Sequence, residues 1–267
     1  MPTIESTGPQ EPHHARQLAE SFGTDPERYD RARPRYPDAL ITRILAESPG
    51  RDVLDVGCGT GIVARQLRAA GARVLGLEPD PRMAAFARRD GLDVEPGKLE
   101  AWDPADRTFD AVVAGQTWHW VDPVAGPARA AEALRPGGLL AVFWNGPEFP
   151  PDLGAAISAA YREVLPDLPF LHQAGSGTTG FDGFLTRTGD GIRQAGGFAE
   201  PAEWRFGWER TYTKEEWLDG VPTAAGHERF PPETLRELTE RIGAAVDAVG
   251  GQFTLTYTTV AVVARRE

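Results

Sequence analysis

The stretch that most constrains how this chain can fold runs from residue 51 to residue 78. It begins with residues 53–56, a short apolar run typical of a buried strand. Three glycines follow at every second position, Gly57, Gly59 and Gly61. A chain that turns this sharply needs positive φ angles, and a ligand lying on the turn needs backbone with no side chain in the way. The sequence therefore predicts a strand, a tight turn and the start of a helix.

The elements after this turn bring a carboxylate close to it. Residues 62–68 have the pattern of an amphipathic helix that ends at Gly71, and residues 74–77 form a second apolar strand with Glu78 at its carboxyl end. In doubly wound α/β sheets, ligands bind outside the carboxyl ends of the strands. An acidic residue about 20 positions after the first glycine is placed to hold a ribose diol. We therefore expect this unit to bind a nucleoside.

Two residues distinguish between the possible nucleosides. A dinucleotide site needs its third glycine or alanine five positions after the first, and Ile62 occupies that position. Asp55, directly before the turn, would repel a phosphate but suits a ligand that carries an ammonium group. A nicotinamide-dependent oxidoreductase is therefore the less favoured alternative.

Two runs of residues resemble the class I S-adenosylmethionine-dependent methyltransferases: Val-Leu-Asp-Val-Gly-Cys-Gly-Thr-Gly, residues 53–61, and Gly-Leu-Glu-Pro-Asp-Pro-Arg-Met, residues 76–83. The resemblance implies a doubly wound α/β fold with a seven-stranded, mostly parallel sheet, and S-adenosyl-L-methionine as the cofactor. It implies methyl transfer to oxygen, nitrogen or carbon of a small-molecule acceptor. A protein that binds this cofactor without turnover has the same fingerprint and stays open as an alternative. The resemblance is dense over residues 53–145 and only general afterwards.

The resemblance also implies which residues hold the cofactor. In the family, the residue near Met83 packs on the adenine, although a simple core methionine is equally compatible with the pattern. The run from Gly97 to Glu100 resembles a Gly-x-Ala-Glu turn that contacts the adenine edge, with Leu99 in place of the usual small residue. The expected cofactor-binding residues are Tyr29, Arg33, Asp55, Gly57, Cys58, Gly59, Gly61, Glu78, Pro79, Met83, Leu99, Glu100 and Gln116.

The N-terminal leader contains Phe22 and the phrase Tyr29-x-x-x-Arg33-Pro-x-Tyr36-Pro37. This phrase resembles the leader of one bacterial branch of these methyltransferases, in which an N-terminal segment folds over the cofactor. Tyr29 or Arg33 would then meet the methionine carboxylate, since a guanidinium offers two parallel charge-assisted bonds. The alternative is that Phe22 and Tyr36 are packing anchors and Arg33 is a surface ion-pair partner.

A second informative stretch follows the expected fourth strand, residues 108–115. Gln116, Trp118, His119 and Trp120 bring aromatic and titratable groups to the carboxyl edge of the sheet. Methyl transfer is an in-line displacement, so the protein must hold donor and acceptor close together, with a base where the nucleophile carries a proton. An ordinary pKa of about 6.5 makes His119 the candidate general base. Because Trp-His-Trp recurs in the family across different substrates, His119 as a wall of the cofactor pocket remains the alternative.

The chain is expected to form one methyltransferase domain, residues 15–267, after a disordered tail at residues 1–14. Its parts are an N-terminal helical lid at 15–48, a cofactor-binding core at 49–145, a cap insertion at 146–197 and C-terminal strands and helices at 198–267. Residues 135–138, Arg-Pro-Gly-Gly, are expected to form a turn before the fifth strand. The cap is expected to select the substrate.

Composition limits the partners. A net charge of −11 with no basic stripe argues against nucleic acid, which binds clustered lysine and arginine. Cys58 is the single cysteine, which excludes internal disulfides and a cysteine-rich metal site and fits a reducing cytoplasm. No apolar run approaches the ~20 residues of a membrane span. The sequence therefore predicts a cytoplasmic protein with a small-molecule acceptor and no metal, and leaves its oligomeric state undetermined.

Overall fold

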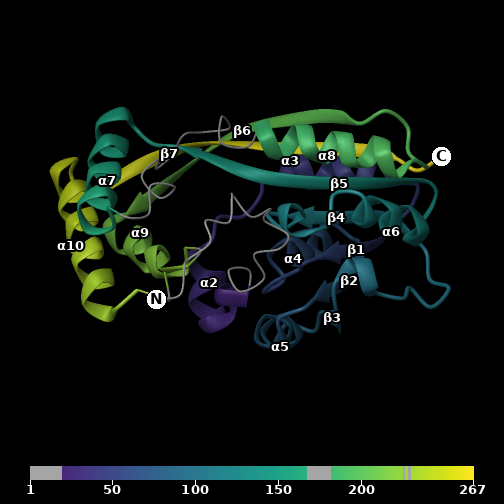
Figure 1. Cartoon of the computed structure of the whole chain (residues 1–267), viewed down its shortest axis with the longest axis horizontal. Helices are drawn as coiled ribbons and strands as arrows, with labels where there is room; N and C mark the ends of the chain where they lie inside the picture. Colours follow the sequence, from purple (N-terminus) through teal and green to yellow (C-terminus); the bar gives the residue numbers. More distant parts are fainter. Residues whose placement is uncertain (1–19, 167–181, 225, 228–229) are drawn as a thin grey trace, which may run out of the picture.

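A computed structural model describes residues 20–166, 182–224, 226–227 and 230–267. Figure 1 shows an elongated molecule built along one twisted sheet, in which the three longest strands run past the others toward one end. These long strands are β5 (Leu134–Glu148), β6 (Ala202–Thr213) and β7 (Gln252–Arg265). Residues 167–181 of the expected cap insertion, 146–197, lie outside the described residues.

The sheet has seven strands in the order β3-β2-β1-β4-β5-β7-β6. The shorter strands are β1 (Asp52–Val56), β2 (Arg73–Glu78), β3 (Asp93–Pro96) and β4 (Phe109–Gly115). Pairing from β3 through to β5 is parallel, whereas β7 runs antiparallel to both β5 and β6. The expected doubly wound, mostly parallel sheet is confirmed. Its strand order reverses between β1 and β4, which is where ligands of such sheets bind.

Helices cover both faces of the sheet. The α-helices are α2 (Pro26–Ala32), α3 (Asp38–Glu47), α4 (Ile62–Ala69), α5 (Pro81–Arg89), α6 (Ala125–Ala133), α7 (Pro151–Val164), α8 (Asp182–Ala195), α9 (Lys214–Gly220) and α10 (Pro232–Ala248). Short 3₁₀ turns are η2 (Glu20–Thr24), η3 (Leu99–Ala101), η4 (Trp118–Trp120) and η7 (Val221–Thr223). Across the described ranges, every helix is too short or too polar to cross a membrane.

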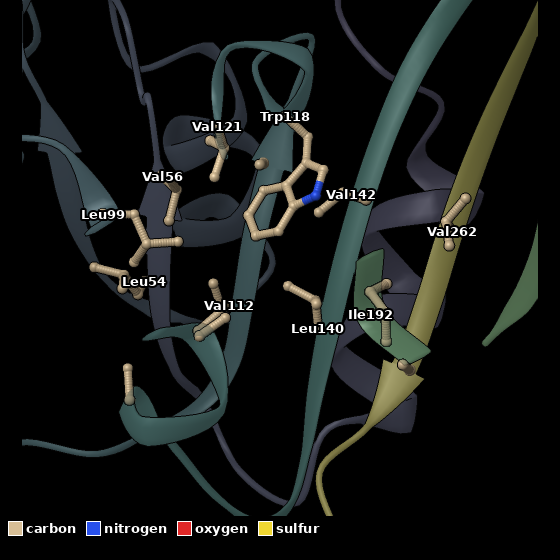
Figure 2. Close-up of a cluster of buried hydrophobic side chains, with 14 of the residues drawn as sticks. Leu54, Val56, Leu99, Val112, Trp118, Val121, Leu140, Val142, Ile192 and Val262 are labelled. Atoms are coloured by element: carbon tan, nitrogen blue, oxygen red, sulfur yellow. The ribbon is translucent and has the colours of Figure 1, made fainter. Parts of the chain in front are cut away.

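The parallel strands are buried on both faces, because successive side chains point to opposite sides of a strand. Leu54 and Val112 belong to the core cluster on one face, whereas their chain neighbours Val53 and Ala111 belong to the cluster on the other. Figure 2 shows the first cluster, with the indole of Trp118 lying among aliphatic side chains from the strands. The helices α3 and α4 cover the second cluster.

A third core cluster lies along the extended ends of the long strands. Its most buried members are Leu153 of α7, Leu238, Ile242 and Val246 of α10, and Leu255 of β7. Figure 1 shows α7, α9 and α10 together at this end, and α2 between them and the parallel core. Helix α8 packs elsewhere, since its Ile192 belongs to the cluster around Trp118. The two helices of region 146–197 thus pack in different places.

Residues 135–138, expected to form a turn before the fifth strand, form an irregular, bulged stretch within the bounds of β5. These residues lie inside β5, which begins at Leu134 directly after α6. Two hydrogen bonds to the far end of the chain hold them there, from Gly137 N to Arg266 O at 2.9 Å and from Arg266 N to Gly138 O at 2.9 Å. The strand is irregular at this point, because its pairing register with β4 shifts and Gly137 has a φ of 77°.

Helix α8 is not predicted by the sequence pattern, because its glycines weaken the helical signal. Gly191 has a packing reason: a Cβ there would lie 1.9 Å from the carbonyl oxygen of Pro123. Gly183, on the same helix, has nothing within 4 Å of such a Cβ. The close approach of α8 to the segment before α6 therefore requires a glycine at position 191, whereas position 183 has room for a side chain.

We predict that Gly191→Ala lowers the free energy of unfolding by about 1–3 kcal/mol, because the new methyl group collides with backbone that cannot yield cheaply. Gly183→Ala is the matched control and should leave stability unchanged or raise it by up to about 1 kcal/mol. Urea unfolding of both variants measures the difference. Equal stabilities of the two variants would contradict the packing of α8 described above.

Candidate functional site

The turn after β1 is built from glycines for two physical reasons. Gly57 and Gly59 have φ angles of 61° and 56°, a region that residues with a Cβ rarely adopt. A Cβ on Gly57 would also lie 2.2 Å from Cγ2 of Thr117, whereas Gly59 faces open space. The amides of Gly57 and Cys58 both donate to the carbonyl of Leu77, at 2.7 and 3.1 Å. The turn is thereby fixed against the end of β2.

Glu78 ends β2 and closes this arrangement. Its Oε2 accepts a hydrogen bond from the amide of Gly59 at 2.8 Å, and its Oε1 accepts one from the amide of Asp80 at 2.9 Å. The residue is only 7% exposed. A carboxylate has about four lone-pair positions, so each oxygen keeps one for a ligand. The Glu78 carboxylate is therefore both fixed in place and able to accept further hydrogen bonds.

A cavity of about 380 Å³ lies at the carboxyl ends of the central strands. Its wall contains all but one of the site residues expected from the sequence: Tyr29, Arg33, Asp55, Gly57, Cys58, Gly59, Glu78, Pro79, Met83, Leu99, Glu100, Gln116 and His119. The exception is Gly61, which precedes α4 with a φ of 89° and does not line the cavity. The structure thus brings together residues from the lid, β1, β2, η3 and the segment after β4.

The wall also contains residues that the sequence analysis did not place in the site, among them Asp80 and Ala224. Asp80 caps α5 by accepting from Arg82 N at 2.8 Å, and its place two residues after Glu78 was a usable signal. Asn145, a polar residue that follows the apolar run of the fifth strand and is expected there to face the substrate, also lines the wall and is 2% exposed. Ala224 comes from the C-terminal region, and no local pattern marks it.

The acidic end of the cavity holds two carboxyl groups with few donors. Oδ2 of Asp55 is buried and has no hydrogen-bond partner among the described residues. Burial, with a smaller contribution from the nearby Glu78 carboxylate, raises the pKa of Asp55 to about 8. Burial also raises the pKa of Glu78 to about 7, against the effect of its two backbone hydrogen bonds. This end suits a ligand that brings positive charge and hydrogen-bond donors.

The opposite charge comes from Arg33, directly after α2. Its guanidinium carbon lies 4.8 Å from the ring centre of Tyr29 and 5.8 Å from that of Phe22. One terminal nitrogen donates to the carbonyl of Thr223, whereas the buried Nε has no partner in the described ranges. A half-buried guanidinium whose Nε lacks a partner suits an anionic ligand group. The cavity wall therefore presents groups of both signs.

The apolar part of the wall is formed by Met83 and Leu99, which are 4% and 1% exposed. Glu100 follows and accepts from the amide of Asp122 at 2.8 Å. Gln116 has a φ of 55°, and its Nε2 donates to the carbonyl of Asn145 at 3.3 Å. Met83, Leu99, Glu100 and Gln116 all line the cavity.

His119 is held by aromatic residues. Its Nδ1 lies 3.2 Å from the indole nitrogen of Trp144, and its ring centre lies 4.6 Å from that of Trp120 and 5.4 Å from that of Phe184. Burial lowers the pKa of His119 to about 4. The imidazole is therefore neutral at neutral pH.

Helix α2 contributes Tyr29 to the cavity wall and has no buried residue. Asp30 forms an ion pair with Arg65 of α4 in the parallel core. Arg28 and Arg31 pair with Asp219 of α9, at 3.1 and 2.8 Å. These ion pairs connect α2 to α4 and to α9.

The parallel core, with its glycine turn after β1 and a cavity where the strand order reverses, defines an α/β protein of the doubly wound class. Residues 54–142 match the model of the methyltransferase domain family. This segment contains β1, β2, β4 and most of the cavity wall. The chain therefore contains a segment of the methyltransferase domain family.

Individual relatives agree with this family. The chain is 38% identical over 135 residues to an uncharacterized methyltransferase of Mycobacterium bovis, a match that covers 49% of this chain and 54% of that protein. The chain thus spans about half the length of the first curated relatives it matches. It is 28% identical over 233 residues to the trans-aconitate 2-methyltransferase of Mycolicibacterium gilvum, which covers 82% of this chain and 85% of that one.

Among solved structures, a candidate type II methyltransferase from Anaeromyxobacter dehalogenans has a similar fold, with a TM-score of 0.58 and 22% identity. The alignment covers 87% of this chain and 97% of that one. At this identity the likeness supports the fold alone.

We predict that, in the ligand-free protein, Asp55→Asn reduces the loss of folding stability that accompanies a rise in pH. Asp55 titrates near pH 4 when unfolded and near pH 8 when folded, so its contribution to stability is complete below pH 4 and is lost as the pH rises to 8. The stability of Asp55→Asn relative to the wild type should therefore increase by about 1–2 kcal/mol between pH 5.5 and 7.5. Urea unfolding at the two pH values measures this change.

The matched control for that experiment is Glu240→Gln, at an exposed carboxylate on α10. It should follow the wild type at both pH values. If Asp55→Asn also follows the wild type, the buried, protonated state of Asp55 is contradicted.

We predict that Asp219→Asn loosens α2, because it weakens two ion pairs on a helix with no buried side chain. Amide hydrogen exchange in α2 should become about 2- to 10-fold faster, and added salt should have the same effect on the wild type. Asp247→Asn, which removes the Lys214 ion pair between α9 and α10, is the control. Equal exchange of α2 in the two variants would show that these charges do not hold the lid.

Proposed function

We propose that this protein transfers a methyl group from S-adenosyl-L-methionine to a small-molecule acceptor. The observation that carries the proposal is the Glu78 carboxylate, fixed by the amides of Gly59 and Asp80 at the end of β2. Its free lone pairs suit the two hydroxyl groups of a ribose. Both hydroxyls can donate to one carboxylate, which is the recognition expected at this place in the fold.

The unsatisfied buried atoms of the cavity fit the amino-acid part of the same cofactor. Asp55 Oδ2 has no hydrogen-bond donor among the described residues and would accept from the ammonium group. Arg33 Nε is short of an acceptor and would donate to the carboxylate, with Tyr29 beside it. One of these atoms is a hydrogen-bond acceptor and the other a donor, and both residues line one cavity. A zwitterionic ligand would give each of them a partner.

The remaining contacts in the proposal are apolar or structural. Met83, Leu99 and Pro79 would pack on the adenine, and Glu100 would lie at its edge. Cys58 and Gln116 would contact the cofactor through the turn and the segment after β4. When bound, the cofactor supplies an electrophilic methyl group on a positively charged sulfur. The chain itself binds and orients both reactants, and its lid excludes water from them.

The acceptor is proposed to be a small molecule. The cavity volume of about 380 Å³ lies in the range of small-ligand pockets. The net charge of −11 disfavours nucleic acid. A relative carries the name of a methyltransferase for trans-aconitate, a small organic acid. The single buried thiol, Cys58, fits a reducing compartment, and we expect the protein to act in the cytoplasm.

We predict that Glu78→Ala weakens binding of S-adenosyl-L-methionine by about 10- to 100-fold, because it leaves two ribose hydroxyls without an acceptor. Isothermal calorimetry of the purified protein measures the dissociation constant. Glu203→Gln, an exposed carboxylate on β6, should bind like the wild type. Unchanged affinity in Glu78→Ala would refute the ribose assignment.

The same titration separates the alternatives. Binding of S-adenosyl-L-methionine and S-adenosylhomocysteine, with none of reduced nicotinamide cofactors, supports the proposal. Binding of the nicotinamide cofactors alone would overturn it. Formation of S-adenosylhomocysteine in the presence of acceptors then distinguishes an enzyme from a protein that only binds the cofactor.

A further inference from the structure

The hydrogen bond between Trp144 and His119 determines which ring nitrogen of His119 carries a proton. Trp144 lies on β5 and is 1% exposed, and its indole nitrogen is 3.2 Å from His119 Nδ1. An indole N–H can only donate. Nδ1 must therefore accept, and a neutral imidazole then carries its proton on Nε2.

Among the described residues, the groups recorded around the ring do not favour its protonation. Its aromatic neighbours Trp120, Trp144 and Phe184 come from η4, β5 and α8. Burial alone lowers its pKa to about 4, and no acidic group opposes this effect. His119 is thus a neutral ring with one fixed tautomer at physiological pH.

The second ring nitrogen is available to a ligand. Within the described residues, Nε2 of His119 has no hydrogen-bond partner, and it is not among the fully buried polar atoms. His119 lines the cavity that also holds Gln116 and Asn145. The side chain therefore offers the cavity one N–H donor. It offers no lone pair for taking up a proton, because the only lone pair already accepts from Trp144.

We propose that His119 donates a hydrogen bond from Nε2–H to a carboxylate oxygen of the methyl acceptor, and that Trp144 is the positioning residue that fixes this tautomer. The inference rests on the proposed function and refines the expectation that His119 is a general base. A donor at this place recognises an acceptor atom that already has free lone pairs. A carboxylate is such a group, since its ordinary pKa of about 4 leaves it ionised at neutral pH.

The chemistry then needs no base. The carboxylate oxygen forms a bond to the methyl carbon, the carbon–sulfur bond breaks, and its electron pair stays on sulfur. The products are a methyl ester and a neutral thioether, and no proton moves. A phenol or an ammonium acceptor would instead have to lose a proton, and His119 in this tautomer cannot take it.

The tautomer is tested directly by NMR of ¹⁵N-labelled protein, without any activity measurement. Two-bond ¹H–¹⁵N spectra distinguish protonated from bare ring nitrogens, and comparison with His119→Gln assigns the signals of His119. We expect a protonated Nε2 and a bare Nδ1 at pH 7. A protonated Nδ1, or a charged ring at pH 7, would overturn the proposal.

The positioning role is tested with Trp144→Phe, which removes the indole N–H and keeps an aromatic ring. His119 should then lose its single tautomer and show a mixture of both. Trp102→Phe removes another buried indole, which donates to Glu95 at 2.7 Å, and controls for general loss of stability. A His119 tautomer unchanged by Trp144→Phe would overturn the role of Trp144.

The role toward the acceptor is tested by two substitutions at His119. Glutamine keeps an N–H donor near the position of Nε2, whereas leucine removes it. For carboxylate acceptors, His119→Leu should raise KM about 10- to 100-fold and His119→Gln much less, with the Kd of S-adenosyl-L-methionine nearly unchanged in both. Equal loss of kcat in both variants would identify a base and overturn the proposal.

The acceptor class is tested with a panel of carboxylates, phenols and amines. Methyl ester formation from a carboxylate supports the proposal, and transfer to phenols or amines with none to any carboxylate overturns it. Calorimetry with S-adenosyl-L-methionine, run on the same samples, distinguishes failure of the proposed function from failure of the inference about His119. Absence of cofactor binding would refute the proposed function, whereas cofactor binding with the wrong His119 tautomer would refute only this inference.

Discussion

The site depends on one interaction, the pair of hydrogen bonds that fixes the Glu78 carboxylate. Because Oε2 accepts from the amide of Gly59, the glycine turn after β1 and the end of β2 form one rigid unit. The carbonyl of Leu77 strengthens this unit by accepting from two amides of the turn. Everything else in the cavity is arranged around this corner, including the start of α4, the cap of α5 at Asp80 and the contact of Thr117 with Gly57.

The second organising feature is that acidic and basic groups line one cavity. Asp55 and Glu78 are buried carboxyl groups of the parallel core, and Arg33 follows α2. Each is costly to bury without a partner, and each has an unsatisfied or available atom. The ligand-free cavity therefore carries an electrostatic cost that a zwitterionic ligand removes. The lid that brings Arg33 is itself held by ion pairs to α4 and α9.

The sequence predicted those parts of the fold and site whose cause is local. The glycine turn, Glu78 and the alternation of buried strands depend on neighbouring residues, so a short pattern reveals them. Three features have distant causes. Arg266 holds residues 135–138 in β5, Pro123 explains Gly191 in α8, and Ala224 reaches the cavity from the C-terminal region. The hydrogen bond that His119 Nδ1 accepts comes from Trp144, a partner 25 residues away that spacing cannot identify.

The measurement that tests the account most directly is a crystal structure of the protein grown with S-adenosylhomocysteine. We predict that both ribose hydroxyls lie within hydrogen-bond distance of the Glu78 carboxylate, with the amino-acid part between Asp55 and Arg33. An adenosyl group bound away from Glu78, or bound there through its base alone, would contradict the central claim that this carboxylate recognises the ribose.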